Sequence, residues 1–169
     1  YGEVATTEVG RRQLFEIHEN TDDAQVRREI LKGFSRHILE PRYWPMMSVA
    51  LESESQNDFL CGVDWLAHQG PSIKDFYRGM FGRTGGRPDG EQRLIHRMIE
   101  LLEQGHNELY RVDRALRSFA SEEFDRQRDF HSDEVRLAAA EHWQAWYRDR
   151  YGVPFVRSVS TDAAEVMSD

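Results

Sequence analysis

The stretch from residue 91 to residue 105, EQRLIHRMIELLEQG, decides the fold of this chain. Its apolar residues follow the i, i+1, i+4, i+7, i+8 spacing that places side chains on one face of an α-helix. These residues are Leu94, Ile95, Met98, Leu101 and Leu102. Gly105 follows them at the position where glycine commonly ends a helix. The segment therefore predicts an amphipathic helix that packs one face against its neighbours.

Two more helices are predicted downstream of this segment. The first carries Leu109, Val112, Leu116 and Phe119 at helical spacing. The second is long: Ser132 stands at its N-cap position, and Gly152 and Pro154 follow its end. It carries Val135, Ala138, Ala139, His142, Trp143, Trp146 and Tyr147, and His142 is expected on its inner side. Residues 153–169 have little to bury and are predicted to form an extended tail.

Four helices are predicted upstream. Residues 23–39 form a clear amphipathic segment, with Thr21 or Asp22 as its N-cap. Shorter helices are expected over residues 44–51 and 58–68, and a fourth begins at Ser72 and continues to Met80. The twelve residues GMFGRTGGRPDG at 79–90 contain five glycines and one proline, which predicts a loop.

This pattern predicts an all-α fold, because no segment alternates apolar and polar residues over the length of a strand. We expect six or seven helices in a single domain that covers residues 1–169, with a core over about 11–152. Most predicted connections are short, so neighbouring helices are expected to pack as stacked antiparallel hairpins.

Charge and hydropathy limit the classes of partner. The chain has 30 acidic and 22 basic residues, for a formal charge of −8. Such a surface repels phosphate backbones, so we expect no nucleic-acid partner. No stretch of about 18 apolar residues is present, so we expect a soluble protein without a membrane span. The chain begins with Tyr1 and not with methionine, which suggests a processed protein or a piece of a longer one, and the compartment is left open.

No catalytic, cofactor or metal site is predicted. The seven histidines include no HExxH or comparable ligand spacing. The glycine-rich loop lacks the GK[ST] ending that a phosphate-binding loop requires, and no GxSxG turn is present. Cys61 lies in the apolar run FLCGVDWLA, where a free cysteine usually behaves as a small buried apolar residue.

Three places share an acidic or amide residue that precedes an arginine near the start of a helix: DDAQVRREI at 22–30, NELYRVDRAL at 107–116 and SDEVRLAAAE at 132–141. Such an opening places a carboxylate over the free amides of the first turn, and its valine faces inward. Its arginine is expected to lie alongside the carboxylate of the next unit.

These motifs resemble HEAT-like repeats, whose helical hairpins stack into an α-solenoid. The closing segments ALRSFASEEFDRQ and VRLAAAEHWQAWYRDRYG are similar to the tryptophan-rich final helix of several bacterial HEAT-like domains. The resemblance covers about residues 11–152, and its alternative is an irregular helical bundle. HEAT-like enzymes with a di-iron centre carry several His-Glu dipeptides, whereas this chain has only His18-Glu19. The resemblance implies a role in binding or assembly.

The sequence therefore predicts a non-catalytic interaction or scaffold module, a subunit or part of a larger assembly. Its partner is expected to be a protein, bound by an aromatic cluster and by arginines that flank the glycine-rich loop. These residues are Trp143, Trp146, Tyr147, Tyr151, Phe155, Arg78, Arg83, Arg87 and Arg93. The aromatic residues have a second interpretation, which is that they seal the end of a helical stack.

The alternative function is an accessory enzyme that handles a cofactor or chromophore, as the HEAT-like lyases do. In that case His142 and nearby carboxylates would act as acid or base.

Overall fold

The computed structural model describes residues 7–37, 39–69, 90–105, 109–120 and 132–157. Within these ranges every regular element is a helix and no residue lies in a strand, so the all-α prediction is confirmed. The elements are α1 (Glu8–Asn20), α2 (Ala24–Ser35), the 3-10 helix η2 (Pro41–Tyr43), α3 (Trp44–Glu52), α4 (Gln56–Gln69), α6 (Gly90–Gln104), α7 (Leu109–Ala120) and α8 (Asp133–Tyr151).

Five helices, α3, α4, α6, α7 and α8, lie where the sequence predicts them, within a few residues at each end. Gly105 follows α6 with a positive φ of 80°, as expected for a helix stop. The predicted helix from Ser72 to Met80 and the glycine-rich loop before residue 90 lie outside the described residues.

The ends of α2 differ from the prediction. Its N-cap is Asp23, whose carboxylate accepts hydrogen bonds from the backbone N–H groups of Gln25 and Val26, at 2.8 and 3.2 Å. The helix ends at Ser35, four residues earlier than expected. Leu39 is buried outside the helix, and its carbonyl accepts a hydrogen bond from the indole N–H of Trp44 at 3.1 Å. The apolar pattern therefore continues past the helix into the connection.

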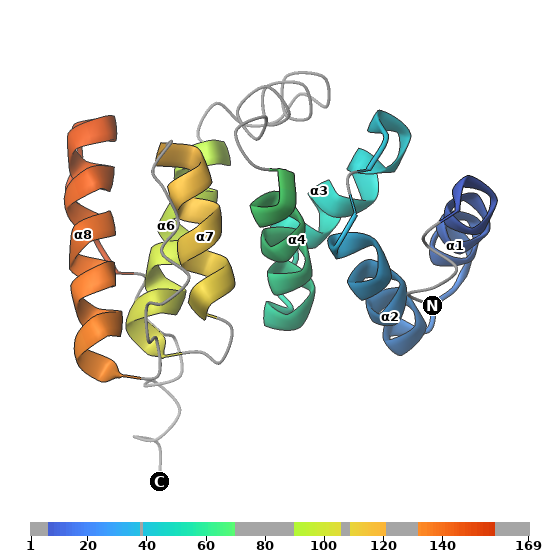
Figure 1. Cartoon of the computed structure of the whole chain (residues 1–169), viewed down its shortest axis with the longest axis horizontal. Coiled ribbons are helices and arrows are strands. Elements are labelled where there is room, and N and C mark those ends of the chain that lie inside the picture. The colour runs from blue at the N-terminus through green and yellow to red at the C-terminus, as the bar shows by residue number, and fades with distance from the viewer. Residues whose placement is uncertain (1–6, 38, 70–89, 106–108, 121–131, 158–169) are drawn as a thin grey trace, which may run out of the picture.

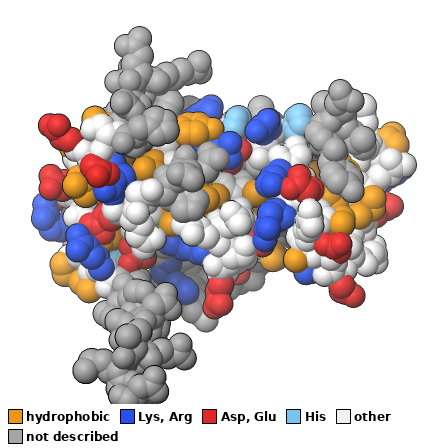
Figure 2. Space-filling view, turned by 90° about the horizontal axis from the view of Figure 1, so that it is seen from below, with side chains coloured by type: hydrophobic (Ala, Val, Ile, Leu, Met, Phe, Trp, Pro, Cys, Tyr) orange, Lys and Arg blue, Asp and Glu red, His pale blue; other side chains and the backbone are white. Residues whose placement is uncertain are grey.

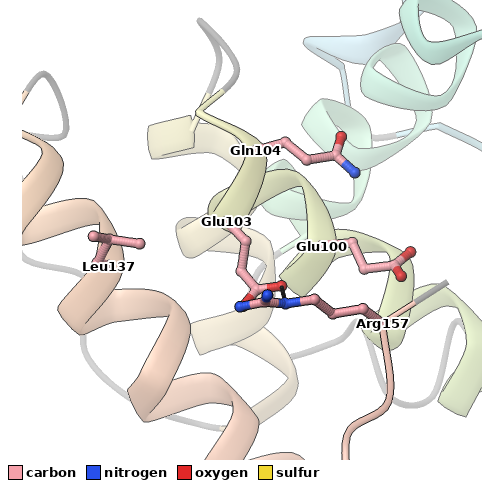
Figure 3. A pocket seen from close by; sticks show the side chains of 5 residues that line it. All are labelled: Glu100, Glu103, Gln104, Leu137 and Arg157. Carbon is pink, nitrogen blue, oxygen red and sulfur yellow. Dashed lines mark hydrogen bonds and ion pairs between the residues drawn. The ribbon is translucent and has the colours of Figure 1, made fainter. Parts of the chain in front are cut away.

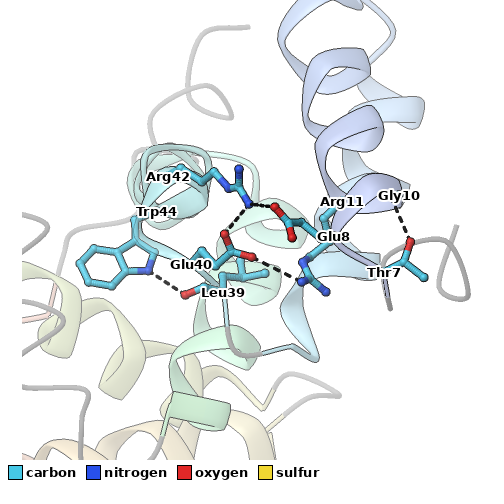
Figure 4. Close-up of polar contacts among 8 residues, drawn as sticks. All are labelled: Thr7, Glu8, Gly10, Arg11, Leu39, Glu40, Arg42 and Trp44. Carbon is cyan, nitrogen blue, oxygen red and sulfur yellow. Dashed lines mark hydrogen bonds and ion pairs between the residues drawn. The ribbon is translucent and has the colours of Figure 1, made fainter.

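Helix α1 is not predicted by the sequence pattern. This helix buries only Gly10 and Leu14, which is too few apolar positions to give a clear period. Its N-cap is Thr7, whose hydroxyl oxygen accepts from the backbone N–H of Gly10 at 3.0 Å (Figure 4). Leu14 and Phe15 attach α1 to the core, the latter with its ring 5.5 Å from that of Tyr43, and Glu8 adds an exposed ion pair with Arg42 at 2.9 Å.

The helices form an elongated arrangement with α1 at one end and α8 at the other (Figure 1). Helices next to one another in the chain pack together, α1 with α2, α3 with α4, and α6 with α7. The second members of these pairs also contact one another in the order α2, α4, α7, and α8 packs on α6. Helix α4 therefore joins the amino-terminal helices to the carboxyl-terminal ones.

A continuous apolar core runs through the described helices. Its largest fully buried side chains include Trp65, Phe34, Phe59, Phe119 and Trp143. At Gly62 of α4 an added Cβ would lie 2.8 Å from the side chain of Leu51 on α3. The absence of a side chain at this position is therefore what lets α3 and α4 pack closely.

Two buried carboxylates connect helices across the core. Asp64 of α4 accepts a hydrogen bond from the Ser35 hydroxyl of α2 at 3.1 Å, and Arg111 Nε of α7 lies 3.4 Å from its other oxygen. Asp113 of α7 is completely buried, and its oxygens accept from Trp143 Nε1 of α8 and from Arg117 Nε, both at 2.8 Å. Each carboxylate thus fixes the position of a neighbouring helix.

The arginines of the three repeated motifs behave in three ways. Arg111 lies beside the carboxylate of Asp64, which belongs to the preceding helix α4 and not to the next unit as expected. Arg27 is exposed, and Arg28, one position further round the helix, reaches Asp58 of α4 at 3.3 Å instead. The expectation is also wrong for Arg136, which donates to the backbone carbonyls of Leu102, at 3.0 Å, and Glu103 at the end of α6.

Arg136 has a counterpart in Arg97 of α6. The guanidinium of Arg97 donates to the backbone carbonyl of Ser53 at 2.6 Å, just past the end of α3. The last carbonyls of a helix have no partner within it, so a long cationic side chain from another helix is well suited to satisfy them. An arginine from a later helix therefore completes the ends of both α3 and α6.

The substitution Asp113→Ala is expected to destabilise the protein by about 3 to 5 kcal/mol, because it removes the buried carboxylate that accepts from the Trp143 indole and from Arg117. Urea denaturation followed by far-ultraviolet circular dichroism measures this change. Asp149→Ala is the matched control, since that carboxylate is exposed and its ion pair with Arg148 is long, at 3.8 Å. Its effect is expected to stay below about 0.5 kcal/mol. Equal losses in the two variants would contradict the role given to Asp113.

Candidate partner-binding surface

The carboxyl-terminal end of α8 turns back along α6. Gly152 ends α8 in the left-handed conformation, with a φ of 68°, and its N–H donates to the Arg148 carbonyl at 2.8 Å. Residues 152–157, named the strap below, contain no regular helix. The sequence analysis expected residues 153–169 to be extended, and those among them that the structure describes are 153–157.

The structure divides the five predicted aromatic residues into two groups. Trp143 and Tyr147 are buried, at 0% and 4% exposed, and belong to the core. Trp146, Tyr151 and Phe155 pack against that core but are only partly buried. The buried pair closes the space beside α6 and α7, whereas the second group keeps surface that a partner could contact.

The partly buried residues form a connected set of edge-to-face contacts. The ring of Trp146 lies 5.8 Å from that of Trp143 and 6.5 Å from that of Tyr151, both nearly perpendicular. The guanidinium of Arg150 lies over the ring of Trp146, 5.1 Å from its centre. Edge-to-face geometry and a cation over the ring both restrict side-chain motion. The exposed part of Trp146 is therefore held in one orientation.

Glu91 in the first turn of α6 anchors this group. Its Oε1 accepts a hydrogen bond from the Tyr151 hydroxyl at 2.8 Å and forms an ion pair with Arg150 at 2.6 Å. Burial, and next the hydrogen bond to Glu91, raise the pKa of the Tyr151 phenol, so it remains a donor at neutral pH. The beginning of α6 and the end of α8 thus form one surface.

The strap is attached to the middle of α6 through His96. The imidazole of His96 stacks on the ring of Phe155, with 4.4 Å between centres, and the ring of Tyr147 lies beside both, 5.7 Å from each centre. His96 Nε2 also lies 2.7 Å from the carbonyl oxygen of Val156, a distance that fits a hydrogen bond donated by the ring. One histidine therefore holds both a side chain and the backbone of the strap.

Arg157 is the last anchor of the strap. Its guanidinium donates to both carboxylate oxygens of Glu103, with distances between 2.9 and 3.2 Å, and this hydrogen bonding raises the pKa of Arg157. The pair borders a hollow of about 280 Å³ between α6 and α8 (Figure 3). Its lining residues are Glu100, Glu103, Gln104, Leu137 and Arg157.

The predicted arginines are only partly covered by the structure. Arg93 is exposed near the start of α6, two positions after Glu91, a spacing that places the two side chains on different sides of the helix. Arg78, Arg83 and Arg87 lie outside the described residues. On the face shown in Figure 2, the basic and acidic side chains of the described residues are intermixed.

Three residues of this surface, Glu91, His96 and Glu103, were missed by the sequence analysis. They lie on α6 beside the apolar stripe that predicted the helix. A series of polar residues at spacings of three to five, from Glu91 through His96 and Glu100 to Glu103, was visible in the sequence. Such a series is usually a solvated helix face, so it gave no reason to expect a strap.

The surroundings of His142 differ from those expected for an acid or base. His142 is exposed, with its ring 4.7 Å from that of Trp143, so the expectation that it faces inward is wrong. The inward stripe of α8 passes through Ala139, Trp143 and Tyr147, and a helix turns about 100° per residue, so position 142 points away from it. No group of three or more metal-ligating side chains occurs within the described ranges.

Cys61 is buried in α4, which confirms its interpretation as an apolar residue of the core. Burial, and next the charge of Asp58, raise the pKa of its thiol to about 11. A thiol in this state is almost entirely protonated at neutral pH and is a poor nucleophile.

Comparison with known proteins gives no assignment, because no protein-family model, curated protein or solved structure matches this chain significantly. Within the described parts of the chain, none of the helices has the length and apolar character needed to cross a membrane.

The state of Cys61 can be measured with a thiol reagent such as dithionitrobenzoate at pH 8. Because the thiol is buried and protonated, the native protein is expected to react roughly 100-fold more slowly than the protein unfolded in urea. The Cys61→Ser variant gives the background of the assay. A native rate similar to that of the unfolded chain would show that the thiol is accessible and ionised.

Proposed function

We propose that this protein is a non-catalytic protein–protein interaction module that binds its partner at the end of α8. The proposal is supported by one observation above all, namely that Trp146 and Tyr151 are partly exposed yet fixed in position. Rigid aromatic side chains bury a large area at little cost in conformational entropy, which is why they often dominate binding energy. Arg93 and Arg150 lie at the same end of the molecule and provide donors for carboxylates of a partner.

The arrangement of the helices supports a scaffold role. We propose that α1 with α2, α3 with α4, and α6 with α7 are successive hairpins of a short HEAT-like solenoid. The contacts between α2, α4 and α7 are those expected if the second helices of stacked hairpins form one layer. In such an array each unit contacts mainly its neighbours, and the terminal helix must seal the last apolar face. Trp143 and Tyr147 fit the role of that seal.

The oligomeric state and the partner are tested together. Gel filtration coupled to light scattering, followed by affinity purification from the native source, is expected to recover the chain within a larger assembly. A monomer that recovers no partner would count against the proposal. Variants of the proposed surface then test whether a recovered partner binds there.

Two tryptophans on the same helix form a matched pair for this purpose. Trp146→Ala is expected to weaken association by on the order of 2 kcal/mol, about 30-fold in Kd, with a smaller effect on unfolding than Trp143→Ala. Trp143→Ala removes a fully buried ring and the hydrogen bond to Asp113, so it is expected to cost about 3 to 5 kcal/mol of stability. Calorimetric titration with the recovered partner and urea denaturation measure the two quantities. A Trp146→Ala variant that loses stability while it binds normally would identify Trp146 as part of the seal and refute the proposed surface.

A further inference from the structure

The strap follows α6 along most of its length. Tyr151 is joined to Glu91 and Arg157 to Glu103, two positions that are twelve residues apart on the helix. Twelve residues of α-helix rise about 18 Å. Six residues of fully extended chain, from 151 to 157, span about 20 Å. The backbone from Tyr151 to Arg157, together with the reach of these two side chains, covers that rise, and the segment after the bend at Gly152 lies along α6 as a bound peptide would.

The contacts of the strap combine three kinds of recognition. Phe155 is held by stacking on His96, the backbone carbonyl of Val156 by the imidazole Nε2, and the guanidinium of Arg157 by both oxygens of Glu103. An aromatic anchor, a backbone hydrogen bond and a bidentate ion pair are features by which proteins recognise extended peptides. The order of the contacts along the strap defines an aromatic residue followed two positions later by arginine.

The strap fills this site incompletely, and its Arg157 anchor is exposed. Among the described residues a hollow of about 280 Å³ lies beside Arg157, with the exposed side chain of Leu137 on its α8 side (Figure 3). The side chain of Arg157 is itself 78% exposed, whereas that of Glu103 is 13% exposed. An ion pair with so exposed a partner contributes little to stability and exchanges readily. The carboxylate of Glu103 is thus a fixed part of the site, whereas Arg157 can be replaced there by an arginine of another segment.

We propose that the groove along α6, between His96, Glu103 and Leu137, is a binding site for an extended segment of a partner protein that contains an aromatic–x–arginine sequence. The chain's own strap occupies the groove in the absence of the partner and competes with it. The proposal rests on the proposed function as an interaction module and specifies its partner chemistry. Charge complementarity supports this occupant, because the α6 side of the groove presents the carboxylates of Glu100 and Glu103.

Gly152 makes this competition possible. Its left-handed conformation ends α8, and no atom lies within 4 Å of where its Cβ would be. The strap therefore joins the helix through a residue with few contacts, and it can leave the groove without disturbing α8. A tethered segment competes at an effective concentration of about a millimolar. A free peptide with a Kd near 100 μM would then bind about 10-fold more weakly to the intact chain than to a chain with a disabled strap.

The test uses a fluorescein-labelled peptide with the sequence GVPFVR, blocked at its carboxyl end, and fluorescence anisotropy. The full chain is compared with its Phe155→Ser/Arg157→Ser variant, in which the groove is intact but the strap has lost two anchors. We expect the variant to bind the peptide about 10-fold more tightly than the wild-type chain. Arg157→Ser alone serves as a second variant, because this exposed side chain can be replaced without effect on folding, and it is expected to give an intermediate affinity.

Reversal of the charge at Glu103 tests whether the groove recognises the arginine of the peptide specifically. In the strap variant, Glu103→Lys is expected to weaken binding of GVPFVR at least 10-fold and to favour GVPFVE instead. Glu103→Gln retains an acceptor for Gln144, which donates to Glu103 at 2.6 Å, and serves if the lysine variant does not fold. It is expected to lower the affinity for GVPFVR and to reduce the preference for arginine over glutamate.

The outcomes distinguish this inference from the proposed function. Three results would each overturn the proposed peptide site. These are no binding of the peptide to the strap variant, equal affinity for the wild-type chain and the variant, and an affinity that does not depend on the phenylalanine and arginine of the peptide. The proposed function would survive that result if Trp146→Ala still weakened association with the recovered partner. A wild-type dimer that Phe155→Ser dissociates would overturn the assignment to a different protein, because the occupant would then be the strap of a second copy.

Discussion

Asp64 lies in the middle of α4 with its carboxylate between the helices on either side. The hydroxyl of Ser35 and the guanidinium of Arg111 approach it from α2 and α7, so one side chain relates three helices. Burying a carboxylate is costly unless its oxygens are satisfied, and only a narrow range of helix positions satisfies both. Apolar side chains supply most of the free energy of packing, but they tolerate small displacements along a helix. The polar contacts of the carboxylate do not tolerate such displacements. Helices α2, α4 and α7 therefore have a defined register relative to one another.

Asp113 applies the same constraint one helix further along. Because its oxygens bind Trp143 and Arg117, the last helix is oriented by a hydrogen bond and not only by the shape of its apolar face. This matters on α8, where apolar residues such as Leu137 and Val135 lie on several sides and leave the inward face poorly defined by hydropathy alone. The orientation imposed at Trp143 is what turns Trp146 and Tyr151 toward the surface.

Much of the fold was predictable because α6 and α7 bury a clear apolar stripe, and because Gly105 and Gly152 mark helix ends by their chemistry. What failed has identifiable physical causes. Helix α1 buries little beyond Leu14, so the apolar period of its sequence is weak. The candidate surface was predicted only in part, since periodicity identifies the helix that carries Trp143 and Trp146 but not which ring is buried. The contacts of the strap join residues about sixty positions apart, such as His96 and Val156, and no local pattern reveals them.

The arginines that complete helix ends also bear on synthesis by the ribosome. Arg97 donates to carbonyls at the end of α3, and Arg136 to those at the end of α6, so each helix end receives its protein partner from a segment made later. While the chain is emerging, water alone satisfies those carbonyls. Each of these two helix ends is therefore complete only after the segment that carries its arginine has been synthesised.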